Sequence, residues 1–348
     1  MKLEKMLKLT LINNIWLSPV LFCNINYKNE PVLFYKWDFV VIFQFTYLER
    51  SDFMFEDIKK NKIKSWFIVL LFLVFISLIV YYICMALDLG TMSIVIAMIF
   101  SIASTWGSYY YSDKIVLSLN KARPATKEEN LKLVNILDAL VVSSGLPCTP
   151  KLYIVEDAQP NAFATGRNPE NAVICVTTGL LDKLEYYELE GVIAHEMAHI
   201  KNYDIRLSAV VSVMVGFVVM LSDWFTRITF WGGTRDRDDD SKGNTILMLI
   251  GLIFLILSPI FGKLMQLAIS RKREYLADAT AIEFTRNPDG LISALQKISG
   301  DPNELKVANN ATENMYIASP FRGKKSSSSL WSTHPSIEDR VEALRNLK

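Results

Sequence analysis

Residues 192–200 read Val-Ile-Ala-His-Glu-Met-Ala-His-Ile, which is the pattern H-E-x-x-H inside an apolar run of helical character. Residues four apart on a helix lie on the same face, so His195 and His199 can offer two imidazole nitrogens to one metal ion. Glu196 lies about 100° round the helix from His195, where it can reach a water at that ion without being a ligand. Two imidazoles and a carboxylate suit one tetrahedral Zn²⁺ per chain, with a fourth position left open. The chain has 3 histidines and two of them fall in this motif, which favours a metal site over two ordinary helix residues.

The third ligand is expected downstream, in the segment Arg273-Glu274-Tyr275-Leu276-Ala277-Asp278. Glu274 and Asp278 are four apart on a predicted helix and therefore share one face. We assign Glu274 to the metal and Asp278 to the N–H of a ligating imidazole, whose tautomer it would fix. Taken alone, the two carboxylates could also be a solvated pair that balances Arg271 and Arg273, but the H-E-x-x-H motif in the same chain argues against this.

Two further candidates lie near the C-terminus. His334 precedes Pro335, which suits the first turn of a helix, and Arg340 follows six residues later. If both reach the metal cleft, they would stabilise the oxyanion that forms when water adds to a peptide carbonyl. The alternative is a histidine that caps its own helix and an exposed arginine.

The composition indicates a membrane protein. The 348 residues are 51% hydrophobic and carry a formal net charge of +1, which is too apolar for an ordinary soluble domain and gives no sign of nucleic-acid binding. The 4 cysteines are scattered without C-x-x-C spacing, so neither a disulfide framework nor a cysteine metal site is indicated.

Four apolar runs predict two transmembrane hairpins. Runs at 66–85 and 92–111 are each long enough to cross a bilayer of about 30 Å. Runs at 207–225 and 245–261 form the second pair, for which two buried core helices are the alternative. The positive-inside rule places both ends of each hairpin in the cytoplasm. The basic residues that set this orientation are Lys59, Lys60, Lys62, Lys64, Lys263, Arg271, Lys272 and Arg273.

The segments between the hairpins predict a soluble part with a small sheet. A helix is expected over 123–145, from its helical spacing of apolar residues and the glycine at its end. Strands are expected at 151–155, 161–166 and 172–177. Residues before Met54 show no clear period, cap or span, and Met54 starts a basic leader, so residues 1–53 are predicted to be a non-native or disordered extension.

These motifs together resemble the HtpX-like membrane zinc metalloproteases, which are related to the CAAX prenyl proteases. The resemblance runs from about Met54 to Lys348, and its motifs are highly specific in combination. It rests on Met54-Phe55-Glu56, the paired spans, Asn161-Ala162-Phe163-Ala164, the H-E-x-x-H motif, Arg273–Asp278 and Thr333-His334-Pro335.

The resemblance implies a mainly α, membrane-anchored fold with an α+β zincin-like (gluzincin) protease domain, a small sheet and the two transmembrane hairpins. The expected division is an extension at 1–53, the leader and first hairpin at 54–111, the first part of the protease domain at 112–206, the second hairpin at 207–268 and the second part of the protease domain at 269–348.

It also implies an endopeptidase at the cytoplasmic face of the bacterial inner membrane that degrades misfolded membrane proteins. Carried over by position, His195, His199 and Glu274 are the zinc ligands and Glu196 is the catalytic base. Asn161 and Ala162 would pair with the substrate backbone by strand addition, and His334 and Arg340 would stabilise the tetrahedral intermediate. The expected partners are polypeptide substrates and the lipid bilayer, without nucleic acid, and the oligomeric state stays open.

Two other functions are weighed against this one. A site-2-type intramembrane protease also uses H-E-x-x-H and takes its third ligand from Asn-Pro-Asp-Gly, a sequence that occurs here at 287–290. Its metal helix lies in the bilayer, where the charged residues that flank this motif would be costly. A membrane-anchored, non-catalytic zinc-binding protein is the second alternative, and it would need a fourth protein ligand such as His334.

Overall fold

The computed structural model describes residues 22–27, 30–35, 59–81, 90, 92–231, 271–307, 311–320 and 335–346. The chain forms two compact units, Met1–Asp57 and Ile58–Lys348. The first unit contains an antiparallel pair of strands, β1 (Phe22–Tyr27) and β2 (Glu30–Tyr35). The sequence does not predict these two strands, which lie in the stretch expected to be an extension.

The second unit contains a small mixed sheet, as expected. Its strand order is β3-β4-β6-β5, in which β4 and β6 are parallel and the other two pairs are antiparallel. The strands are β3 (Arg123–Pro124), β4 (Lys151–Val155), β5 (Ala162–Thr165) and β6 (Val173–Thr177). The three strands predicted from the sequence are confirmed to within one residue at each end, and β5 lies at an edge of the sheet.

The helix predicted over 123–145 is shorter in the structure, because β3 takes its first residues. Helix α5 (Lys127–Ser144) begins after Thr126, whose side chain accepts from the backbone N–H of Glu129 while the Glu129 carboxylate accepts from the Thr126 N–H. Two unpaired backbone N–H groups of the first turn are thereby satisfied. The helix ends at Gly145 with a φ of 69°, a left-handed conformation that glycine adopts without strain.

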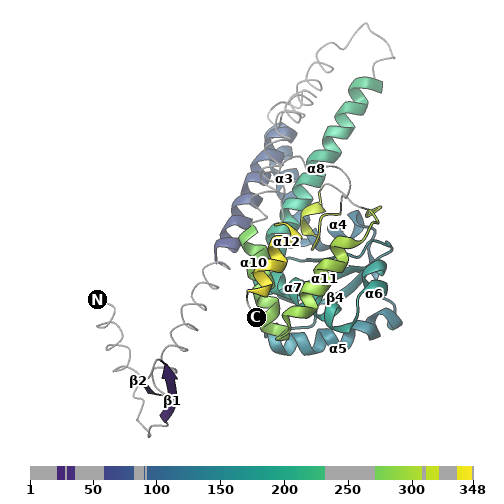
Figure 1. The fold of residues 1–348 in the computed structure, drawn as a ribbon. Coiled ribbons are helices and arrows are strands. Elements are labelled where there is room, and N and C mark those ends of the chain that lie inside the picture. The colour runs from purple at the N-terminus through teal and green to yellow at the C-terminus, as the bar shows by residue number, and fades with distance from the viewer. Residues whose placement is uncertain are drawn as a thin grey trace, which may run out of the picture. The chain divides into compact units, whose positions relative to one another are not determined.

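Helix α7 (Tyr186–Lys201), which contains the H-E-x-x-H motif, lies at the centre of this unit (Figure 1). It packs against β5, α5, α10 (Arg271–Thr285) and α11 (Pro288–Gly300). Contact with α11 is close, because a Cβ on Gly191 would meet the Leu291 Cα at 2.8 Å. Smaller elements complete the unit: η1 (Pro169–Asn171), α6 (Thr178–Lys183), η2 (Glu313–Met315) and α12 (Ile337–Arg345).

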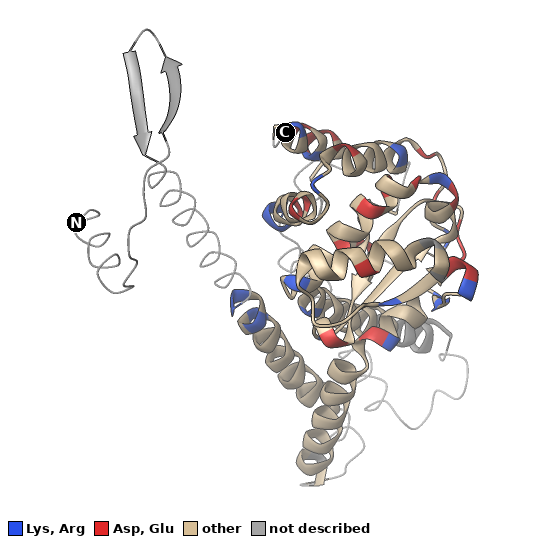
Figure 2. Ribbon diagram, turned by 90° about the horizontal axis from the view of Figure 1, so that it is seen from below, with Lys and Arg blue, Asp and Glu red and all other residues tan. Residues whose placement is uncertain are grey.

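Apolar helices extend away from the sheet and α7. Helix 59–81 packs its Ile68, Phe72 and Ile76 against α8 (Asp204–Trp231), and α3 (Met92–Tyr110) lies beside α8 (Figure 1). Figure 2 shows basic residues at the start of helix 59–81 and few charges along the rest of it, whereas charged residues are spread over the part that surrounds α7. After α3 the chain bends by 72° into α4 (Ser112–Leu119).

These helices include the candidate membrane spans. Within the described part of the chain, Lys59–Tyr81 is by itself long and apolar enough to cross a membrane. Up to three spans result if each of two bent pairs, α3 with α4 and α7 with α8, counts as one. Large apolar side chains such as Phe67 and Ile99 are about two-thirds exposed, which suits a lipid surround. The fourth predicted run, at 245–261, lies outside the described residues.

Candidate metal centre

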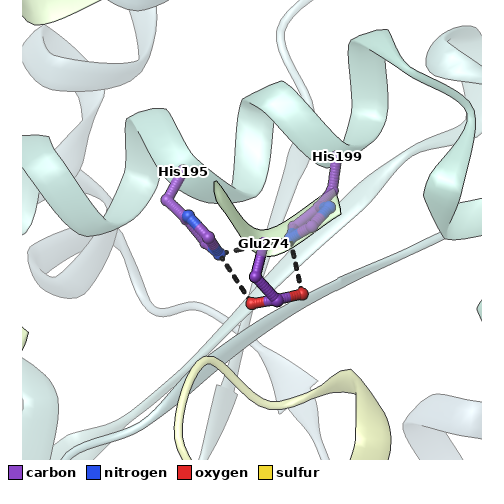
Figure 3. Close-up of side chains that lie close together, drawn as sticks. All are labelled: His195, His199 and Glu274. Atoms are coloured by element: carbon purple, nitrogen blue, oxygen red, sulfur yellow. Dashed lines mark hydrogen bonds and ion pairs between the residues drawn. The ribbon is translucent and has the colours of Figure 1, made fainter. Parts of the chain in front are cut away.

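Three side chains predicted to bind a metal come together in the structure. His195 and His199 project from α7 toward the carboxylate of Glu274, which is carried by α10 (Figure 3). The two Nε2 atoms are 3.2 Å apart. Glu274 Oε2 lies 3.7 Å from the His195 Nε2, and Glu274 Oε1 lies 3.6 Å from the His199 Nε2.

The donor atoms of these three residues fit a zinc-sized cation. For a tetrahedral ion with bonds of about 2.0–2.1 Å, neighbouring ligand atoms are about 3.3 Å apart. The two Nε2 atoms lie close to this separation, and each faces a different oxygen of Glu274 at a slightly longer distance. The local charge also favours a cation. Burial alone would lower the pKa of His199, but its hydrogen bond to Asp204 and the charges of Glu274, Asp204 and Glu196 raise that pKa to about 9. The same negative field would stabilise a divalent ion at this point.

Asp278, which the sequence places one turn after Glu274, contacts the ring of His195. The His195 Nδ1–H donates to Asp278 Oδ1 over 2.9 Å, which leaves its Nε2 lone pair facing the other two donors. Burial lowers the pKa of His195, which keeps the ring neutral as a metal ligand must be. Asp278 is itself held by Arg340, which donates from Nε to Oδ2 at 2.8 Å and from an Nη2–H to Oδ1 at 2.6 Å.

The orientation of His199 is set by a residue that the sequence reasoning missed. The His199 Nδ1–H donates to Asp204 Oδ2 over 3.1 Å. Asp204 is the first residue of α8, and the axes of α7 and α8 differ by 83°. The sequence does show a carboxylate five residues after His199, just beyond the predicted helix. Whether the Asp204 side chain points back toward His199 depends on this bend, which the sequence does not show.

Glu196 lies on the wall of the same cleft and is only 2% exposed. Burial raises the pKa of its carboxyl to about 7, against the opposing charges of His199 and Arg340. The backbone N–H of Ala164 in β5 donates to this carboxylate and lowers the same pKa in part. A carboxyl group poised near neutral pH is suited to accept and return a proton.

The cleft contains a second polar group that sequence reasoning missed. Asn314, in η2, lines the cleft and is 5% exposed, yet neither its Oδ1 nor its Nδ2 has a hydrogen-bond partner in the described part of the chain. A buried amide is costly when it is left without hydrogen bonds. The other residues of the wall are Ala164, Asp204, Ile205, Ser208, Arg273, Met315, Tyr316 and Ile317, in addition to the metal triad and Glu196.

Asn161 and Ala162, expected to bind the substrate backbone, are bonded to another part of this chain. The Ala162 carbonyl accepts from the Ile317 N–H at 2.9 Å. The Asn161 side chain donates to the Ala318 carbonyl at 3.0 Å and accepts from the Ala318 N–H at 3.4 Å. The outer edge of β5 is therefore already paired at these two residues. Ala164, two residues further along the same edge, lines the cleft.

The remaining candidates are placed as follows. Arg340 was expected to stabilise the oxyanion; it is fully buried, donates to Asp278 and to the Ile317 carbonyl, and has its Nη1 3.7 Å from Glu274 Oε2. His334 lies outside the described residues. Asp289 of the Asn-Pro-Asp-Gly sequence lies in the first turn of α11, and it is Glu274 that meets the two imidazoles.

Comparison with known proteins agrees with this centre. Residues 127–348 match the model of peptidase family M48. The chain is 44% identical over 291 residues to a Protease HtpX homolog of Dictyoglomus thermophilum, covering 84% of this chain and 94% of that protein. It is 42% identical over 309 residues to a Protease HtpX homolog of Listeria monocytogenes, covering 84% of this chain and all of that protein.

A solved structure, that of S. mikatae Ste24p, is also similar at 22% identity and a TM-score of 0.44, covering 83% of this chain and 66% of that one. The family match and the two relatives stand without it. The chain has the H-E-x-x-H helix, the Glu274 carboxylate close to both imidazoles, and apolar helices in the same unit. Together with the family match and the two relatives, these features show that the chain belongs to peptidase family M48 and is a membrane metalloprotease.

Proposed function

We propose that the protein is a zinc-dependent endopeptidase that cleaves misfolded or damaged membrane proteins at the cytoplasmic face of the bacterial inner membrane. The observation that carries the catalytic part is the convergence of His195, His199 and Glu274 beside a buried glutamate. A gluzincin-like protease domain joined to two transmembrane hairpins is the architecture we propose for it.

One Zn²⁺ per chain would be held by His195, His199 and Glu274. When bound, it would supply a positive charge that polarises the scissile carbonyl and makes water a stronger acid. The protein's part is to aim both imidazoles inward, which Asp278 and Asp204 do by accepting from the two Nδ1–H groups. Glu274, buried between the rings, adds the negative charge that favours a divalent over a monovalent cation.

Glu196 is the general base in this mechanism. Its carboxylate takes a proton from the attacking water and later gives that proton to the leaving amine. The Ala164 N–H holds the carboxylate in place, and burial keeps its pKa near 7, so that both transfers are feasible near neutral pH. His334 remains our candidate for a donor to the oxyanion, and we assign Arg340 to the support of Asp278.

The substrate is proposed to bind as an extended strand along the outer edge of β5. Asn161 and Ala162 are paired with Ile317 and Ala318, so the substrate would pair at Ala164, where this edge reaches the cleft. Recognition of backbone groups reads no side chains, which suits loose specificity toward unfolded chains. The apolar helices beside the cleft would bring it close to membrane-protein substrates.

The orientation follows from the charges at the helix ends. Lys59, Lys60, Lys62 and Lys64 lie at the start of helix 59–81 and would hold that end in the cytoplasm. Helix α7 is flanked by charged residues and lies next to the sheet, so we place the metal centre outside the bilayer on the same side.

Metal analysis with casein digestion in detergent tests the proposal, for the wild type and Glu196→Gln in parallel. Both should contain about one zinc per chain, and the variant should lose hydrolysis by a factor of about 10² or more. A zinc-loaded wild type that cleaves no unfolded substrate would support a non-catalytic zinc protein instead. Glu190→Gln, a change on the same helix but outside the described cleft wall, is the matched control and should retain activity.

A further inference from the structure

The carboxylate that orients His199 is itself held by the first apolar helix. Asp204 uses Oδ2 to accept from the His199 ring, and its other oxygen, Oδ1, accepts from the Nδ2 of Asn61 at 2.8 Å. Asn61 is carried by helix 59–81, 143 residues away from Asp204 in the sequence. Arg273 also approaches Oδ1, with its Nη1 at 3.4 Å.

Asn61 also contacts the end of the helix that bears the two histidines. Its Nδ2 donates to the carbonyl of Asn202 over 3.1 Å, and Asn202 is the C-cap residue of α7. One carboxamide thus bridges the last turn of α7 and the first residue of α8, at the point where the chain bends by 83°. Asn61, Asn202 and Asp204 are all at most 5% exposed, so solvent does not replace these bonds.

The position of Asn61 on its own helix fixes where its side chain lies. It continues the buried stripe of helix 59–81, which otherwise carries Ser65, Ile68, Phe72 and Ile76. The three apolar residues of that stripe pack against α8, so the apolar packing holds the helix in register with the residue that follows the bend. Asn61, at the polar end of this buried stripe, is thereby placed against Asp204.

We propose that Asn61 is a positioning residue for the metal centre: by holding Asp204 it sets the direction of the His199 ring. A carboxylate fixed at both oxygens has little freedom to rotate, so the His199 Nε2 stays aimed at the other donors. The seating of a membrane helix against α8 would then determine how well the site holds its metal. This rests on the proposed role of His199 as a ligand.

Metal binding by the full-length protein in detergent tests the inference without relying on hydrolysis. Asn61→Ala and the isosteric Asn61→Asp, which lacks the N–H donors, should weaken Zn²⁺ binding in competition with a chelator by about tenfold. Both should also change the visible absorption of the Co²⁺-loaded protein, which reports ligand geometry. In hydrolysis assays the loss should fall on kcat more than on KM.

Ser65→Ala is the matched control. Ser65 is buried one turn further along the same helix, and its Oγ donates only within that helix, to the Asn61 carbonyl at 2.8 Å. This variant should bind Zn²⁺ and absorb as the wild type does. If both Asn61 variants match Ser65→Ala in metal affinity and in the Co²⁺ spectrum, the inference is wrong.

A double variant separates positioning from a general loss of structure. If Asn61 acts through Asp204, adding Asn61→Ala to Asp204→Asn should weaken metal binding little beyond Asp204→Asn alone. Effects that multiply would overturn the inference, and this test remains available if one single variant folds poorly. Glu274→Ala is measured beside these variants. If Glu274→Ala retains its metal, the proposed ligand set is wrong. If Glu274→Ala loses its metal while the Asn61 variants bind metal as the wild type does, only the positioning role of Asn61 is wrong.

Discussion

Arg340 and Asp278 form a two-point ion pair in the interior, with Nε–Oδ2 and Nη2–Oδ1 distances of 2.8 and 2.6 Å. Neither side chain has more than 3% of its surface exposed. Asp278 also accepts from His195, so a chain of hydrogen bonds links α12 through α10 to α7, the helix that carries the two histidines. The pair fixes a ligand from behind, and Arg340 also places its Nη1 3.7 Å from Glu274 Oε2, so its charge acts on the metal triad as well.

Arg340→Lys is expected to weaken metal binding by about tenfold, because lysine keeps the charge but cannot contact both Asp278 oxygens at once. Stability should also fall, by about 1–3 kcal/mol, since a buried carboxylate loses hydrogen bonds. Arg345→Lys is the control, as Arg345 is an exposed residue of the same helix. Chelator competition and thermal unfolding in detergent measure the two effects, and equal results for both variants would contradict the prediction.

Glu274→Ala and Asp289→Ala should differ completely in metal content. Removing Glu274 takes away the carboxylate that lies within 3.7 Å of both imidazoles, so the site should lose most of its zinc. Asp289 is exposed in the first turn of α11, so its removal should leave the metal in place. Elemental analysis of the two purified proteins decides the matter: retention of zinc only in Glu274→Ala would assign the third ligand to Asp289.

Asn314→Ala should raise KM for an unfolded peptide about tenfold, or about 1.4 kcal/mol, because the buried carboxamide is expected to bond a peptide group of the substrate. Thermal stability should be unchanged or slightly higher, since no hydrogen bond to a described residue is lost. Steady-state kinetics with Asn171→Ala, an exposed asparagine outside the cleft wall, as the control would test this. A loss of stability with unchanged KM would show that Asn314 is purely structural.

Gly191→Ala should destabilise the protein by about 1–3 kcal/mol, although alanine favours helices over glycine by about 1 kcal/mol. The added Cβ would lie 2.8 Å from the Leu291 backbone, which cannot move aside as a side chain would. Gly300→Ala, in α11 with no atom within 4 Å of the new Cβ, is the control and should be neutral. Thermal unfolding of the two variants in detergent measures the difference, and an unchanged midpoint for Gly191→Ala would show that α7 and α11 are not packed this closely.

Features that depend on a single element could be predicted. The pairing of His195 with His199, and of Glu274 with Asp278, follows from i,i+4 spacing on one helix. The three strands β4, β5 and β6 were recognised from short β-branched or apolar runs between turns. Arg123 and Pro124 were assigned to a helix because propensity alone does not show that a neighbouring strand will pair with them.

Contacts between distant elements could not be predicted in the same way. Arg340 was expected to stabilise the oxyanion because the resemblance assigns that role to its position, but α12 packs its buried face onto the core and pairs Arg340 with Asp278. The pairing of Ile317 with Ala162 was likewise invisible, because the segment that contains Ile317 has no strand pattern of its own.

By itself, the sequence predicted which side chains could bind a metal and which apolar runs could cross a membrane, since helical spacing and the length of apolar runs are local properties. The tertiary structure alone decided that Asp204 orients His199, that Asn61 holds Asp204, and that Asn314 in the cleft has no hydrogen-bond partner among the described residues. The physical reason is that these relationships depend on the bend between α7 and α8 and on the packing of helix 59–81, neither of which any single segment specifies.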